Sequence, residues 1–310
     1  MKAKFLFIGL LCIGLLSCEK DSKRENEKDS SNNQENTNGK NTPSYIKNGA
    51  LPGVFSVSDT KQVKFSRGNL QYRASTDTWR FAEHQYDMVG MGYGQIDENM
   101  VCYVAGNVQN SDNRGISSTY IGWIDLFGWG TGNNPTITST YNEDYLTFVD
   151  WGVNKISNGG NVANAWFTLS YDEWNYLINT RANASSKRGV AEVNGIPGLV
   201  LLPDNWTLPT GVEFTFGIAS EQGSEYYKTV NTYTASEWTL MEKAGAVFLP
   251  AAGYRHSRTM LLAGTGAIYW SCTEYHTDYA YYLIFVSNEI DMKFDLLYLG
   301  QSVRLVQEVE

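Results

Sequence analysis

The chain has few of the residues on which metal sites, disulfide frameworks and nucleic-acid surfaces depend. Its 310 residues include only 4 Cys and 3 His, and 24 Lys and Arg stand against 33 Asp and Glu, a net charge of −9. His84, His256 and His276 do not have the spacing of metal ligands. So acidic a surface lacks the basic patch that phosphate binding needs. The composition therefore predicts no cofactor and no nucleic-acid partner.

Long apolar runs are also scarce, and the one that is present lies at the N-terminus. Lys2 and Lys4 precede an apolar run over residues 5–16, which is typical of a signal peptide and too short for a mature membrane-spanning helix. Residues 15–18 read Leu-Leu-Ser-Cys, which resembles the bacterial lipobox, where the Cys becomes an acylated N-terminus. The alternative is an ordinary signal peptide with an incidental Cys. We predict a lipoprotein signal peptide over residues 1–17 and a lipid anchor on Cys18.

The segment that follows has almost nothing to bury. Residues 19–44 read EKDSKRENEKDSSNNQENTNGKNTPS, so residues 18–44 are predicted to form a lipidated, disordered tether. Charged residues directly after Cys18 resemble the surface-export signals of Bacteroidetes lipoproteins. Loss of Lys2 and Lys4 leaves 22 basic against 33 acidic residues, a mature net charge near −11. We expect a protein anchored by lipid in the outer membrane and exposed on the cell surface.

Residues 45–310 contain no second linker and read as one domain rich in Gly, Trp and Tyr. Of the 4 Cys, only Cys102 and Cys272 lie outside the predicted signal peptide and lipid anchor. Two Cys do not make a disulfide framework, so the sequence leaves open whether these two form a disulfide bond. Short apolar or alternating runs bounded by Gly, Asn and Asp predict strands. The clearest of these runs cover residues 54–57, 63–65, 79–81 and 199–202.

Two helices carry start signals. Ser170 with Glu173, and Thr234 with Glu237, have the spacing of a capping box, in which each side chain satisfies a free amide of the first turn. The predicted inward faces are Trp174, Leu177 and Ile178 in the first helix, and Trp238, Met241 and Ala244 in the second, with Gly245 as the stop. Short strands, long loops and two helices predict the α+β class.

Several motifs then follow in a familiar order. They are FSRGNL at 65–70, WRFA at 79–82, LPAAGYR at 249–255, YWS at 269–271 and GQSVRLV at 300–306. This series resembles the major paralogous lipoprotein domains of Bacteroidetes and Fibrobacter, over about residues 50–306. The resemblance implies a C-type lectin-like fold of the formylglycine-generating-enzyme type.

Some members of that family are variable proteins of diversity-generating retroelements. In them, adenines of the C-terminal coding stretch are replaced at random, and the lectin fold displays the varied residues on one face. Where the family usually reads Tyr-Trp-Ser-Ser, this chain has Ser271 followed by Cys272, which one adenine change in an AGC codon explains. Glu274, Glu289 and Lys293 lie outside the set that an Asn codon can reach.

The resemblance places a variable, ligand-binding face at residues 256–299. Its predicted members, all within the Asn-derived set, are His256, Ser257, Arg258, Leu261, Leu262, Ile268, Tyr275, His276, Asp278, Tyr279, Tyr282, Ile284, Val286, Asp291, Phe294, Asp295, Leu296, Leu297, Tyr298 and Leu299.

The residues themselves support such a face. Residues 294–299 fit neither a strand alternation nor a helix face, so they are predicted to be an exposed apolar connection, which marks an interaction site. The alternative is that Leu296 and Leu297 belong to a buried terminal strand. Exposed tyrosines at 275, 279, 282 and 298 add rigid contact area.

Side chains alternate between the two faces of a strand, and this alternation predicts the orientation of the strand over residues 281–286. Tyr281, Leu283 and Phe285 are expected to face the core, and Tyr282, Ile284 and Val286 to face solvent.

The predicted function is non-enzymatic binding of a protein or glycan ligand on a phage, host or bacterial surface. The first alternative is an adhesion or structural lipoprotein of the same fold whose sequence is not diversified. A less favoured one is a formylglycine-generating-type oxidase, because neither Cys102 nor Cys272 lies in that family's catalytic sequence context. The calcium-binding motifs of sugar-binding lectins, Glu-Pro-Asn or Gln-Pro-Asp with Trp-Asn-Asp, are also absent.

Overall fold

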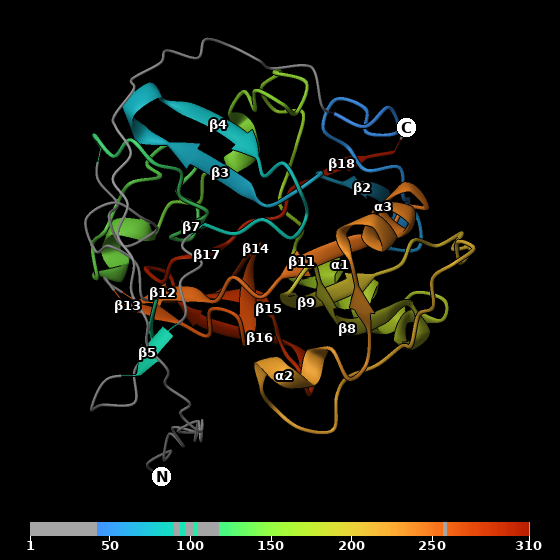
Figure 1. Ribbon diagram of the computed structural model, residues 1–310. Helices are drawn as coiled ribbons and strands as arrows, with labels where there is room; N and C mark the ends of the chain where they lie inside the picture. Colours follow the sequence, from blue (N-terminus) through green and yellow to red (C-terminus); the bar gives the residue numbers. More distant parts are fainter. Residues whose placement is uncertain (1–41, 90–93, 97–101, 105–117, 257–258, 310) are drawn as a thin grey trace, which may run out of the picture. The chain divides into compact units, whose positions relative to one another are not determined.

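Two sheets organise the chain (Figure 1). The computed structural model describes residues 42–89, 94–96, 102–104, 118–256 and 259–309, within a compact unit spanning Asn41–Glu310. The five-stranded sheet has the order β16-β15-β14-β17-β7, and the four-stranded sheet the order β10-β8-β9-β11. The strands of the first are β7 Leu126–Phe127, β14 Gly266–His276, β15 Tyr279–Val286, β16 Glu289–Leu296 and β17 Gln301–Ser302. Those of the second are β8 Arg188–Val193, β9 Ile196–Leu201, β10 Thr232–Tyr233 and β11 Val247–Pro250.

Smaller sheets hold the remaining strands. The end of the chain, β18 Val306–Glu308, pairs with β2 Gln62–Phe65, which pairs in turn with β1 Phe55–Ser56, so both ends of the folded unit share one sheet. Three two-stranded ladders complete the set: β3 Leu70–Arg73 with β4 Thr78–Phe81, β5 Gly94–Ile96 with β6 Cys102–Val104, and β12 Tyr254–His256 with β13 Thr259–Leu261.

The helices begin where the sequence predicts. α1 Tyr171–Asn175 and α3 Ala235–Lys243 both start in complete capping boxes, and α1 continues as a π-helical turn over Tyr176–Thr180. At the end of α3, Gly245 has φ +103°, and the amides of Gly245 and Ala246 donate to Glu242 and Met241. This is a Schellman ending, in which a left-handed glycine lets the last carbonyls find donors. A third helix of one turn, α2 Ser224–Tyr227, carries no side-chain cap and was not predicted.

Three apolar cores alternate with the two sheets. Core 1 lies between the sheets and takes Leu283 and Phe285 from β15 together with Leu199 and Leu201 from β9. Core 2 covers the other face of the five-stranded sheet, and core 3 packs α3 against the other face of the four-stranded sheet. The central strands of each sheet are therefore covered on both faces.

The architecture confirms the α+β class, and the four predicted strands match β1, β2, β4 and β9 to within a few residues. Trp174, Leu177 and Ile178 are fully buried in core 1, as expected, and Trp238 and Met241 in core 3. Among the described residues, no helix combines the length and apolarity that crossing a bilayer requires. The predicted signal peptide, Cys18 and nearly all of the tether lie outside the described residues.

Candidate ligand-binding surface

At the outer end of the five-stranded sheet, two large aromatic side chains, Tyr275 and Phe294, reach solvent. Along β14, residues 266–271 are buried, whereas Glu274, Tyr275 and His276 are exposed. Strand β14 bulges between Trp270 and His276, where its register with β15 shifts, and a bulge re-aims side chains at the end of a ladder. Beyond the bulge, residues 274–276 of β14 are exposed, although their neighbour Ala280 in β15 still packs in core 2.

Five aromatic side chains gather at this end, and we call them the aromatic cluster: Tyr171, Tyr275, Tyr279, Tyr281 and Phe294. Tyr275 stacks on Phe294 with ring centroids 3.8 Å apart and meets Tyr281 edge-on at 5.0 Å. Tyr171 lies 4.2 Å from Tyr281, and Tyr279 lies 5.9 Å from Phe294. Tyr275 and Phe294 are each 45% exposed, so the cluster presents stacked rings to solvent.

Local hydrogen bonds hold the cluster in place. The amide of Tyr171, at the start of α1, donates to Thr273 Oγ1 at 3.0 Å, which fixes α1 on β14. Ser271 Oγ donates to the carbonyl of Tyr281 at 2.8 Å, which fixes β14 on β15. The rings therefore stand on three paired strands and a helix start rather than on a loop, which favours a preorganised surface.

The structure divides the predicted site residues into three groups. The exposed ones are His256, Tyr275, His276, Asp278, Asp291 and Phe294. The half-buried ones are Leu261, Leu262, Tyr279, Ile284, Asp295, Leu296 and Tyr298. The buried ones are Ile268, Tyr282, Val286, Leu297 and Leu299. Ser257 and Arg258 lie outside the described residues.

The predicted orientation of β15 is wrong for its outer face. Leu283 and Phe285 do enter core 1, but Tyr282 and Val286 are buried as well, Ile284 is half-buried, and Tyr281 is partly exposed in the aromatic cluster. Tyr282 and Ile268 pack in core 2. A strand that is covered on both faces has no solvent-facing row, so the period of two separates two cores instead of inside from outside.

The predicted connection over residues 294–299 is also wrong in its first half. Phe294, Asp295 and Leu296 belong to β16 and pair with β15. Leu297 and Leu299 are buried in core 2, and the carbonyl of Leu297 accepts from the amide of Trp129 at 2.9 Å. Leu297 is therefore buried, as the alternative predicted, but it lies in the turn after β16 and not in a strand. Leu296 is half-buried.

A second group of polar residues borders core 2. His256 Nε2 lies 3.3 Å from the hydroxyl of Tyr298, and their rings are 5.7 Å apart. Burial raises the pKa of the Asp295 carboxyl above its ordinary value, which the nearby His256 opposes, and burial raises the pKa of Tyr254 to about 12. The hydroxyls of Tyr254 and Tyr298 are therefore protonated at neutral pH and can donate hydrogen bonds.

Cys272 is a free, partly buried thiol. Burial, with Asp150 and Glu173 nearby, raises its pKa to about 11. Because the thiolate is the nucleophile, such a thiol reacts poorly at neutral pH. The side chain of Cys102 lies outside the described residues.

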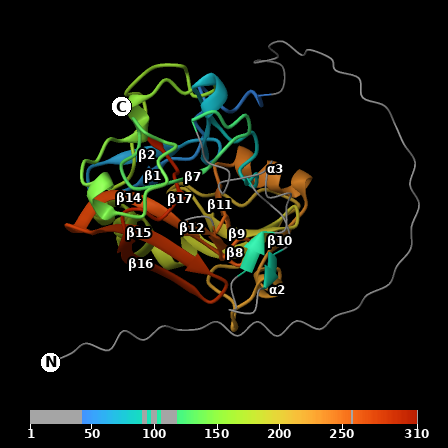
Figure 2. The same cartoon turned by 90° about the vertical axis from the view of Figure 1, so that its left-hand side faces the viewer.

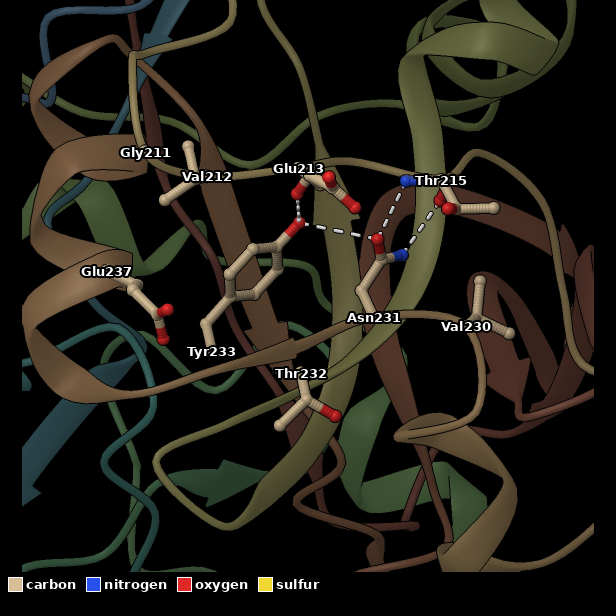
Figure 3. A pocket seen from close by; sticks show the side chains of 9 residues that line it. All are labelled: Gly211, Val212, Glu213, Thr215, Val230, Asn231, Thr232, Tyr233 and Glu237. Atoms are coloured by element: carbon tan, nitrogen blue, oxygen red, sulfur yellow. Dashed lines mark hydrogen bonds between the residues drawn. The ribbon is translucent and has the colours of Figure 1, made fainter.

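One hollow among the described residues lies elsewhere and contains none of the predicted site residues. It measures about 590 Å³ and lies beside β10 and the start of α3 (Figure 3). Its buried polar side chains bond within the protein: Tyr233 donates to the carbonyl of Glu213, and Asn231 pairs with the backbone of Thr215. Glu237 caps α3. These bonds hold residues 213–215 against β10 and the residue before it.

Sequence reasoning missed two members of the aromatic cluster, Tyr171 and Tyr281. Tyr171 joins it only through the docking of α1 on β14, for which a single sequence carries no signal. Among the described side chains, no three His, Cys, Asp or Glu residues come together as a metal site would require. No family model matches the chain, and no curated protein or solved structure is significantly similar to it.

Proposed function

We propose that the chain is an exported lipoprotein that binds a macromolecular ligand through the outer end of its five-stranded sheet. The observation that carries the proposal is the aromatic cluster, with Tyr275 and Phe294 stacked and exposed on paired strands. Exposed contiguous aromatic area on a rigid scaffold is typical of recognition surfaces. In this proposal Cys18 carries the lipid anchor, residues up to 44 form the tether, and the ligand is a protein or glycan of a phage, host or bacterial surface.

The proposal extends to the fold family and to diversification. A C-type lectin-like fold of the formylglycine-generating-enzyme type and a retroelement-diversified C-terminus are both inferred from the motifs that end in residues 300–306. Diversification is compatible with the exposed candidates, because a changed side chain there costs the fold little. It is incompatible with Ile268, Tyr282, Val286, Leu297 and Leu299, since random polar replacement in a packed core unfolds the molecule.

The test is a comparison of coding sequences. We expect, downstream of the gene, a near copy of the stretch for residues 256–299 that differs only where the copy has adenine, beside a reverse transcriptase. Across isolates, substitutions should concentrate at Tyr275, His276, Asp278, Asp291 and Phe294. The five buried positions should keep apolar or aromatic residues.

The burial of five candidate positions favours one alternative, an adhesion lipoprotein of fixed sequence. Independent isolates would then share the same residues over 275–299, and neither the near copy nor the reverse transcriptase would be present. That result would exclude diversification, and the proposed function would then be ligand binding by a surface of invariant sequence.

A further inference from the structure

Strand β16 forms the outer edge of the five-stranded sheet. Its 8 residues pair with β15 along their whole length, and no described strand pairs with its other side. The two views agree that β16 borders the sheet, with β15 and β14 on one side of it (Figures 1 and 2). Such an edge is a template for a further strand, because its outward amides and carbonyls lack ladder partners.

The register identifies which backbone groups face outward. The turn of Ser287 and Asn288 closes on the pair Val286–Glu289. Bonded and non-bonded pairs alternate along an antiparallel ladder, so from this closing pair the even-numbered residues of β16 direct their backbone groups away from β15. In agreement, the amides of Met292 and Leu296 donate to the side chains of Asp291 and Asp295, at 2.8 Å each.

The side chains of β16 form two rows of different chemistry. Ile290, Met292 and Phe294 form an apolar row that continues into the aromatic cluster, and Glu289, Asp291, Lys293 and Asp295 form a charged row. Leu296, at the end of the strand, packs against core 2 instead. At the turn before β16, the amide of Ala219 donates to the carbonyl of Ser287 at 2.7 Å.

The charge around the edge is acidic. Asp278, whose carbonyl accepts from the amide of Leu297, adds to the three acids of β16. Two bases stand against them: Lys293 pairs with Glu289, and Arg188 interacts with Asp291. Among the described residues, no ion pair involves Asp278 or Asp295. A second copy of this strand would bring the same acids together, so a basic strand fits better than self-pairing.

We propose that the edge of β16 takes an extended, basic segment of the protein ligand, which adds a sixth strand to the sheet. This inference rests on the proposed function and names the chemistry of its ligand. Backbone bonds to β16 supply affinity that is independent of side-chain identity, and the exposed side chains of the cluster supply specificity. In a diversified face the backbone bonds would stay constant, whereas the preference for a basic segment belongs to this sequence, because Asp278 and Asp291 are among the positions expected to vary.

The test uses synthetic peptides and the chain without residues 1–18, which precede the compact unit. The probe is a fluorescent peptide of alternating Lys and Val, 8 residues long to match β16, which places Val beside the apolar row and Lys beside the charged row. Two control peptides replace Lys by Glu, or carry N-methyl groups on the central backbone amides. We expect saturable binding of the Lys peptide in fluorescence anisotropy, at least about tenfold weaker binding of the Glu peptide, and none of the methylated one.

A matched pair of variants tests the protein side. Met292→Pro removes an outward amide, which donates to Asp291 Oδ1 and would exchange that partner for the peptide, without removing a bond to β15. Met292→Ala removes the side chain but keeps that amide. We expect the Lys peptide to bind the Pro variant about fivefold more weakly than the Ala variant, the effect of one ordinary hydrogen bond. Should Met292→Pro fail to fold, the methylated peptide still tests backbone pairing on the unaltered protein.

Three outcomes would overturn the inference: equal binding of the Lys and Glu peptides, binding of the methylated peptide, or no binding at all. Sedimentation analysis adds a fourth, since a dimer that Met292→Pro abolishes would make a second copy of the chain the occupant of the edge. None of these results bears on the coding-sequence comparison, so the proposed function can stand where this inference fails.

Discussion

At the scale of single residues, Leu297 stabilises the fold and His276 does not. The side chain of Leu297 is fully buried in core 2, whereas that of His276 is exposed beyond the bulge of β14. We expect Leu297→Ala to lower the free energy of unfolding by about 3 kcal/mol, because it removes apolar contacts and leaves a cavity. His276→Ala should change it by less than about 0.5 kcal/mol. Urea denaturation followed by tryptophan fluorescence measures both, and equal effects would show that the turn after β16 is not packed as described.

At the scale of secondary-structure elements, the cap of α3 offers a test within one helix. Thr234 Oγ1 accepts from the amide of Glu237 at 3.2 Å, and the Glu237 carboxylate accepts from the amide of Thr234 at 2.7 Å. Thr234→Ala should cost about 1 kcal/mol of stability, since it leaves an amide of the first turn without a partner. Thr239→Ala is the control, because that exposed hydroxyl bonds only within the helix; its expected effect is below about 0.5 kcal/mol. Equal melting temperatures for the two variants would contradict a stabilising cap.

The secondary-structure elements also show which features the sequence could predict and which it could not. A capping box lies within four residues, so Ser170 and Thr234 were sufficient to locate both helix starts. The exposure of a strand depends on what covers it, and β15 is covered by residues from distant parts of the chain. Tyr282, for instance, packs in core 2 with Trp129 and Trp151. Alternation indicated that Tyr282 and Leu283 face opposite ways, which is correct, but not that both sides are filled. Of the predicted site, the sequence therefore identified exposed members such as Tyr275 and Phe294, but not that residues 294–296 belong to a strand or that Tyr282 is buried.

At the scale of the whole molecule, cores 1 and 2 share a sheet and should unfold together. Neighbouring residues of β14 enter different cores: Tyr269 packs in core 1 and Trp270 in core 2, where its indole donates to the carbonyl of Phe127 at 2.7 Å. In β15, Leu283 and Tyr282 do the same. Neither core can open without withdrawing these strands from the other, so the described unit is expected to behave as one cooperative structure.

This argument predicts a single transition for variants in either core. Leu283→Ala in core 1 and Ile268→Ala in core 2 should each move one common midpoint to lower denaturant concentration, by an amount that corresponds to about 2 to 5 kcal/mol. Trp174 reports on core 1 and Trp166 on core 2, so tryptophan fluorescence and far-ultraviolet circular dichroism should give coincident curves in both variants.

If Ile268→Ala instead produced an early fluorescence change with most of the secondary structure retained, core 2 would unfold independently. The sheet would then not couple the two cores, and the aromatic cluster would be supported from the core 1 side alone, because Tyr171 stands on α1 while Tyr281 and Phe294 share a face of the sheet with Leu283.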